Sequence, residues 1–336
     1  MGVSPPFSTD GPRLVTDPRL RPTPDYGTLG PGLDTSDLDP ARTQRPAGKS
    51  SLRFAHLIAV VVGMTTALIA GTLSKTHPNW PRTVPARPAE IRDSSQLAGI
   101  KPQKQAEILL EQAVAQSDGA VEQILSRVDR WRGKVEWNPQ IASLTTAALN
   151  SNDMRVRESG VEVELAAYGL SKNSASVEYL LNTVESPDHR QKIWALWALG
   201  LMANRGVDAH RIAGRLASHL KDSDEDSRRW AVESLAVAGT DDVIPTLLVT
   251  MHDDVSPLVR ERAACSLAES GMFTPEQRMR AVPQLLAYTD DPNLDPQTQG
   301  WAFQALADIT HQRLPRDSAA WRSWYESRDQ GLGVRE

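Results

Sequence analysis

Apolar residues recur every three to four positions along most of the chain after Lys104, which is the period of an amphipathic α-helix. The first such segment places four of them on one helical face: Ile108, Leu109, Ala113 and Val114. Alternation of apolar and polar residues at every second position, which is typical of strands, is nearly absent from this region. The pattern therefore predicts an all-α folded region over residues 104–328, followed by a flexible C-terminus over 329–336.

A second pattern precedes the folded region, where residues 54–73 contain no formally charged side chain. At ~1.5 Å per residue, a helix of this length spans ~30 Å, the thickness of a bilayer's hydrocarbon core. Trp80 follows at the position of an interfacial anchor. A buried core helix fits less well because Pro-rich segments flank the stretch, and a signal peptide would need a shorter preceding region. We expect one transmembrane helix.

The charges beside this predicted span are nearly balanced, with Arg42, Arg45, Lys49 and Arg53 before it facing Lys75, Arg82 and Arg87 after it. The positive-inside rule slightly favours the N-terminal tail in the cytoplasm and the folded region outside. If the protein is bacterial, this predicts a single-pass protein of the inner membrane.

Small residues repeat at every fourth position of the predicted span: Ala59, Gly63, Ala67 and Gly71. They lie on one helical face, which would let two spans pack closely as a homodimer. Gly and Ala are also common in spans that do not associate, so the oligomeric state stays open.

The segments around the span lack the apolar residues needed for a core. Residues 1–53 contain nine Pro and six Gly, and residues 74–103 are also rich in Pro. Such sequences cannot bury enough apolar surface to offset the entropy of ordering. We expect a disordered tail over 1–53 and a semi-extended linker over 74–103.

The folded region is internally repetitive. One position recurs as Gly160, Ala195, Ala231, Ala263 and Ala302, at spacings of 35, 36, 32 and 39 residues, and a Leu follows four residues after each of the four Ala. A second helical segment lies between successive members of this series. A period of 30 to 40 residues with two helices is typical of a solenoid of stacked hairpins.

Local motifs in these repeats resemble the HEAT repeat. The closest copy is Val259-Arg260-Glu261-Arg262-Ala263, and two of the intervening helices carry Pro-x-Leu-Leu, beginning at Pro245 and Pro283. The C-terminal run that contains Trp321 and Trp324 is similar to the closing segment of bacterial HEAT-repeat proteins. The resemblance covers about residues 150–327 and implies a right-handed α-solenoid.

The resemblance also implies a function, because HEAT solenoids usually bind protein segments on the surface lined by the Val-Arg helices. We therefore expect a membrane-anchored interaction scaffold without catalysis. Two alternatives are an enzyme-related module, since some bilin lyases are built from HEAT-like repeats, and an oligomeric structural membrane protein.

The position directly before the repeated Gly or Ala is occupied by Ser159 in the first repeat. In the later repeats it is occupied by the candidate partner-binding residues Trp194, Trp230, Arg262 and Trp301. Trp and Arg are favoured anchors at protein interfaces. The position lies about 100° from the buried centre of the helix, so the same side chains can also pack between repeats. Packing between repeats is the favoured interpretation.

Acidic pairs and runs mark the turns between helices, as at 222–226 and 290–291. They lack the ligand spacing of a calcium loop, and Asp at a helix start satisfies free backbone N–H groups. Helix capping is therefore the preferred interpretation. The basic residues Arg157, Arg228 and Arg260 recur at one position and are expected to pair with these turns.

No catalytic or cofactor-binding motif is present, and the five His residues of the folded region are scattered without metal-ligand spacing. The single cysteine, Cys265, is next to a repeated Ala and is expected to be a packing residue. The net charge of −5 argues against nucleic acid as the main partner. We therefore expect no cofactor, no metal and a protein partner.

Overall fold

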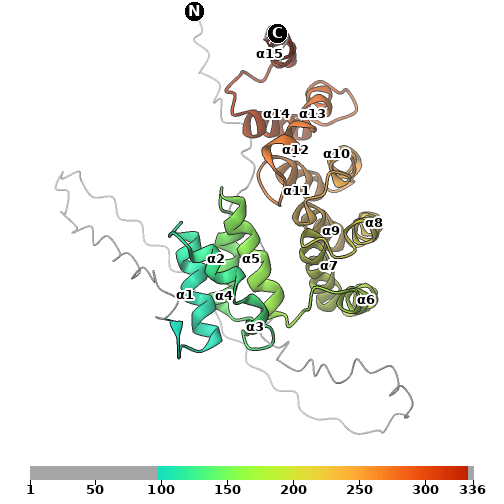
Figure 1. Ribbon diagram of the computed structural model, residues 1–336. Helices are drawn as coiled ribbons and strands as arrows, with labels where there is room; N and C mark the ends of the chain where they lie inside the picture. Colours follow the sequence, from blue (N-terminus) through green and yellow to red (C-terminus); the bar gives the residue numbers. More distant parts are fainter. Residues whose placement is uncertain (1–96, 332–336) are drawn as a thin grey trace, which may run out of the picture. The chain divides into compact units, whose positions relative to one another are not determined.

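A computed structural model describes residues 97–331, and this part of the chain contains fifteen α-helices and no strand (Figure 1). The first five helices are α1 (Pro102–Val114), α2 (Ala120–Leu125), α3 (Val128–Trp131), α4 (Pro139–Leu149) and α5 (Met154–Ala167). The next five are α6 (Ser174–Thr183), α7 (His189–Asn204), α8 (Ala209–His219), α9 (Glu225–Ala238) and α10 (Val243–Asp253). The last five are α11 (Pro257–Ala268), α12 (Pro275–Met279), α13 (Val282–Tyr288), α14 (Pro296–Thr310) and α15 (Ser318–Gly331).

The turn residues start the helices as the sequence predicts. Asp224 is the N-cap of α9, and its carboxylate accepts a hydrogen bond from the backbone N–H of Ser227 at 2.8 Å. Asp242, in contrast, precedes α10 without a side-chain capping bond. Capping is thus confirmed at Asp224 but not at Asp242.

The segment between α11 and α14 is divided into two short helices, α12 and α13. Thr274 and Gln277 form a complete capping box at the start of α12. Pro283 lies in the first turn of α13, where its missing N–H costs no intrahelical bond. The proline restarts the helix because a ring at that position cannot continue the preceding one.

Buried apolar side chains form two clusters that share α5. The first cluster joins α1–α4 to one face of α5, which contributes Val156 and Val163. The second extends from α5 through α15 and takes Val161 and Leu165 from the opposite face. Because α5 is buried on both faces, it links the N-terminal helices to the repeats.

The repeats stack through the helices that carry the recurring Ala. Helix α7 packs against α9, α9 against α11, and α11 against α14, while α6, α8, α10 and α13 pack beside them (Figure 1). The four recurring Ala side chains have no exposed surface, as predicted: Ala195, Ala231, Ala263 and Ala302. The Leu four residues after each is buried as well.

The first predicted repeat behaves differently. Helix α5 packs mainly against α4, and Gly160 lies against the Cβ of Ala148. Its contact with α7 is smaller than those between the later repeats. The weaker match of this segment to the repeat therefore has a structural basis.

Two predicted boundaries need correction. Helix α1 begins at Pro102, and Leu97 is already buried at 1% exposure, so folded structure begins before residue 104. At the other end, α15 continues to Gly331, into the segment expected to be flexible. A pattern of apolar positions places helix ends only to within a few residues, so both observed ends lie slightly beyond the predicted ones.

Three predictions concern residues outside the described range. They are the disordered tail over 1–53, the linker as far as residue 96, and the transmembrane span over 54–73. The prediction for the span includes its face of small residues, Ala59, Gly63, Ala67 and Gly71. Within residues 97–331, no helix has the length and apolar character required to cross a membrane. The handedness of the solenoid stays a prediction.

Candidate functional site

The basic residues at the recurring position link successive repeats. Three of the four, all except Arg157, donate to a carboxylate in the turn that precedes the next stacked helix. The pairs are Lys192 with Asp222 at 3.0 Å, Arg228 with Asp254 at 2.9 Å, and Arg260 with Asp295 at 3.0 Å. The prediction that Arg228 and Arg260 pair with turns is thus confirmed, and these charges belong to the scaffold.

The arginines at this recurring position also donate hydrogen bonds to the turn that precedes their own helix. Arg228 donates to the carbonyl of Asp222 at 3.0 Å, and Arg260 to the carbonyl of Asp254 at 2.7 Å. In α14 the equivalent residue, Gln299, donates to the carbonyl of Asp291 at 2.8 Å. The uncharged Gln299 therefore keeps this local bond.

The four candidate partner-binding residues are all buried in the structure. Trp194 and Trp230 are 8% exposed, Arg262 is 7% exposed and Trp301 is 4% exposed. Burial on this scale favours the interpretation that they pack between helices. Their direct contact with a partner stays a prediction.

The tryptophans contact other aromatic side chains across helix boundaries. The ring of Trp230 in α9 lies 5.9 Å from that of Trp197 in α7, in an edge-to-face arrangement. Trp194 packs in the same way against Tyr168 and Tyr179. Such pairs stabilise helix packing beyond the effect of buried area alone.

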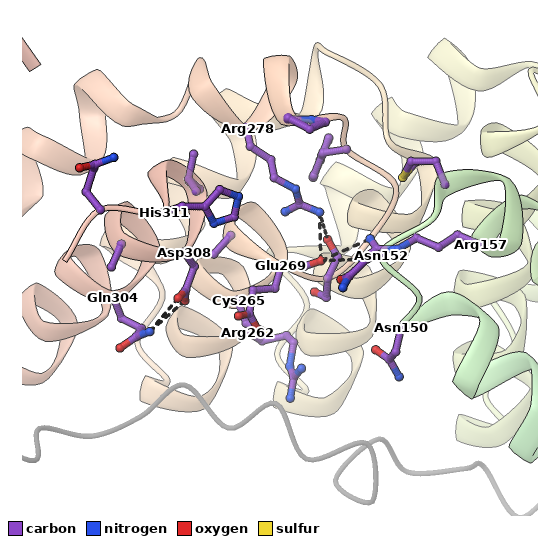
Figure 2. Close-up of a pocket in the computed structure, with 18 of the residues that line it drawn as sticks. Asn150, Asn152, Arg157, Arg262, Cys265, Glu269, Arg278, Gln304, Asp308 and His311 are labelled. Atoms are coloured by element: carbon purple, nitrogen blue, oxygen red, sulfur yellow. Dashed lines mark hydrogen bonds between the residues drawn. The ribbon is translucent and has the colours of Figure 1, made fainter. Parts of the chain in front are cut away.

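A pocket of about 1000 Å³ is the candidate binding site (Figure 2). One wall is the turn between α4 and α5, which contributes Asn150 and Asn152. The other walls come from α11, α12, α14 and the loops that follow α11 and α14. Of the four residues named above, only Arg262 lines this pocket.

Two arginines on the pocket wall converge on the C-terminal end of α11. Arg278 donates to four backbone carbonyls, those of Ser266, Leu267, Glu269 and Ser270, at 2.7 to 3.1 Å. Arg157 donates to the same Glu269 carbonyl at 3.3 Å and to the carbonyl of Gly271. The last carbonyl groups of a helix have no hydrogen-bond partner within the helix, so the two arginines cap the C-terminal end of α11.

The convergence of these charges has an electrostatic cost. Burial, together with the nearby positive charge of Arg157, lowers the pKa of Arg278 to about 10. A cation beside a helix C-terminus is favoured by the helix dipole, which offsets part of this cost. Arg157, predicted to pair with a turn, donates to the carbonyl oxygens of Ser151, Glu269 and Gly271.

Two carboxyl groups face the same pocket. Partial burial raises the pKa of Glu269, and the nearby Asp308 raises it further. Burial also raises the pKa of Asp308, whose oxygens accept a hydrogen bond from Gln304 at 2.9 Å. Figure 2 shows Glu269 at the end of α11 and Asp308 on α14.

Cys265 also lines the pocket, but the residue is only 3% exposed. Burial raises its pKa to about 11, so the reactive thiolate is scarce at neutral pH. A packing role is consistent with both observations. Among residues 97–331, no three His, Cys, Asp or Glu side chains are grouped so that they could hold a metal ion.

The sequence pattern did not reveal this pocket. Its walls join residues that are far apart in the chain: Arg157 and Glu269, whose carbonyl accepts its hydrogen bond, are 112 residues apart. Arg278 carries no motif, because its partners are backbone carbonyls that any sequence supplies. The one local signal is the Val-Arg position of Arg157.

Residues 212–307, from α8 into α14, match the family model of HEAT repeats. No curated protein matches the sequence.

Proposed function

Because this chain is a HEAT-repeat protein, we propose that it is an interaction scaffold that binds a segment of a partner protein. HEAT repeats commonly mediate protein–protein interaction. The observation that carries the proposal is the pocket of about 1000 Å³ beside the stacked helices α11 and α14. A pocket of this size exceeds what one side chain fills, so it suits several residues of a partner.

The interior of the stack supports a rigid receptor. The recurring Ala and Leu are fully buried, and charged pairs fix the turns of successive repeats. A preformed surface binds with a smaller loss of conformational entropy than a flexible one does. The scaffold itself would therefore change little when the partner binds.

Site-specific photocrosslinking in cells tests this function. A photoreactive residue at Gln312, on the rim of the pocket, is expected to give one discrete protein adduct. The matched control is Ala175, an exposed residue of α6 that does not line the pocket. The proposal fails if Gln312 gives no adduct, or if both positions give the same set of adducts.

The sequence supports a further part of the proposal, that residues 54–73 anchor this scaffold in a membrane. The supporting feature is the absence of formal charge over a length that matches the hydrocarbon core. The full chain is then expected to resist extraction from membranes by alkaline carbonate. Release of the full chain by carbonate, or membrane retention after deletion of 54–73, contradicts the anchor.

A further inference from the structure

Basic side chains outnumber carboxyl groups around the pocket. Two carboxyl groups line it, those of Glu269 and Asp308. The arginines that line it are four, Arg157, Arg262, Arg278 and Arg313. This local excess is opposite in sign to the net charge of −5 of the whole chain. A negatively charged ligand is therefore favoured at this place by the charges of the pocket and not by those of the chain as a whole.

Two of the four arginines already bind the fold. Arg278 donates hydrogen bonds to four carbonyl oxygens at the end of α11. Arg157 donates to the carbonyl oxygens of Ser151, Glu269 and Gly271. Both side chains therefore add positive charge to the wall of the pocket, while the donors for a ligand must come from other residues.

The two carboxyl groups have partners within the same wall. Both oxygens of Asp308 accept hydrogen bonds from Nε2 of Gln304, at 2.9 and 3.0 Å. Burial raises the pKa of Glu269, and the positive charges of Arg278 and Arg157 act against that rise. Neither carboxyl group forms an ion pair with Arg313 among the described residues, so the charge of this arginine is not neutralised by them.

Arg313 and His311 are the exposed basic groups of the pocket. Both lie in the loop that follows α14, and neither side chain forms a hydrogen bond or an ion pair with another residue of the described range. A guanidinium has five N–H donors, and an imidazole has at least one. The rim of the pocket therefore carries donors that the fold itself does not use.

A separate observation inside the wall also indicates an absent acceptor. Arg262 lines the pocket and is 7% exposed, and its Nε lies 3.2 Å from Oε1 of Glu233 without forming a hydrogen bond. Within the described residues, the Nη atoms of Arg262 have no hydrogen-bond acceptor either. Buried donors without acceptors are costly and therefore uncommon. A carboxylate that entered the pocket would supply an acceptor.

We propose that the pocket binds acidic side chains, aspartate or glutamate, of the partner segment, with Arg313 and His311 as donors at the rim and Arg262 as a donor in the wall. The assignment rests on the proposed interaction function and specifies the chemistry of the partner. Phe273 and Ile309 also line the pocket, so an apolar residue beside the acidic ones completes the fit.

Binding of defined peptides to the full chain tests the proposal. The probes are three labelled peptides, Gly-Ser-X-Leu-X-Ser-Gly with blocked ends, in which X is Glu, Gln or Arg. We expect the Glu peptide to bind at least about tenfold more tightly than the other two in fluorescence anisotropy. Its affinity should also fall as salt is raised, because salt screens the charges at the exposed rim.

Variants of the two rim residues provide the second arm. Arg313→Ala with His311→Asn is expected to lower the preference for Glu over Gln to about threefold or less. Asn suits position 311 because the backbone there is left-handed, with a φ of 57°. Thermal unfolding should show an intact fold, since both side chains are exposed and make no hydrogen bond within it.

The matched control is Arg190→Ala with His210→Asn, which removes one exposed arginine and one exposed histidine that do not line the pocket. This control should keep the full preference for the Glu peptide. Equal loss of the preference in both double variants would show that the net charge of the chain, and not the pocket, selects the peptide.

Three further outcomes overturn the proposal. They are binding of the Gln or Arg peptide as tight as that of the Glu peptide, absence of binding at about 1 mM, and a tenfold preference that survives the rim substitutions. A discrete crosslink at Gln312 together with any of these results leaves the scaffold function standing and rejects only the acidic side chains. Absence of that crosslink rejects the scaffold function itself.

Discussion

Arg228 of α9 forms a two-point ion pair with Asp254, its Nε and Nη2 atoms lying 2.9 and 3.1 Å from the two carboxylate oxygens. Asp254 precedes α11, so the pair joins two successive repeats. The side chains are 10% and 5% exposed, respectively. This position therefore combines the geometry of a strong hydrogen bond with nearly complete removal from water.

Replacement of Arg228 by Ala is expected to destabilise the fold by about 3–5 kcal/mol, because it leaves the buried Asp254 charge without a partner. Urea denaturation measures the change. The comparison is Arg211→Ala, which removes an exposed ion pair with Glu178 and should have a small effect. Equal effects of the two substitutions would show that burial of the Arg228 pair has no energetic consequence.

Gly200 permits the close approach of α7 and α9. A Cβ atom at this position would lie 2.6 Å from the carbonyl oxygen of Ser234, which is backbone and cannot rotate away. Gly200→Ala should therefore destabilise the fold by about 1–3 kcal/mol despite the better helix propensity of Ala. Gly214→Ala in α8 is the control, because no atom lies within 4 Å of its added Cβ; it should be neutral or stabilising.

Trp230→Ala is expected to lower the free energy of unfolding by about 3–5 kcal/mol, since the ring is 8% exposed and packs against Trp197. Chemical denaturation of the variant checks this. A variant with unchanged stability would instead favour direct binding of a partner by Trp230. Retention of the Gln312 crosslink in a destabilised but folded variant would separate packing from recognition.

His252 lies between α10 and the turn before α14, and it makes the stability of this contact depend on pH. Hydrogen bonds to Asp253 and, across the repeat boundary, to Asp291 at 3.3 Å raise the pKa of His252. A raised pKa means that the stabilisation is complete below the ordinary value of about 6.5 and disappears as pH rises through the folded-state value.

The stability advantage of the native chain over His252→Asn should therefore be larger at about pH 6 than at about pH 9. The buried His219 has a lowered pKa and acts in the opposite direction, but it is present in both proteins and cancels in the difference. His210→Asn, at an exposed site, serves as the control. If the difference in stability between the native chain and His252→Asn is the same at both pH values, the ion pair of His252 with the aspartates does not contribute.

Cys265 should react slowly with thiol reagents in the native protein. Its pKa of about 11 and its 3% exposure both reduce attack by the thiolate. At pH 8 we expect alkylation at least about a hundredfold slower than in denaturant. Because the chain has one cysteine, the label reports this site alone, and rapid labelling of the native protein would contradict the buried position.

Local patterns in the sequence were sufficient for much of the fold. The recurrence of Ala231 and Ala263 identified the buried face, because helix periodicity and burial are properties of one segment and its neighbour. The cap at Asp224 and the restart at Pro283 follow from backbone chemistry within a few residues. The pairing of Arg228 with a turn was predictable for the same reason, since the repeat fixes the offset between them.

The pocket and the function of its charges were decided by the tertiary structure. Arg157 reaches a carbonyl 112 residues further along the chain, and no periodic pattern encodes that distance. Arg278 binds backbone oxygens, which carry no sequence signal. The sequence thus determined a stack of helical repeats with a candidate membrane anchor, whereas the packing of α11 against α14 decided that Glu269 and Asp308 face a common pocket.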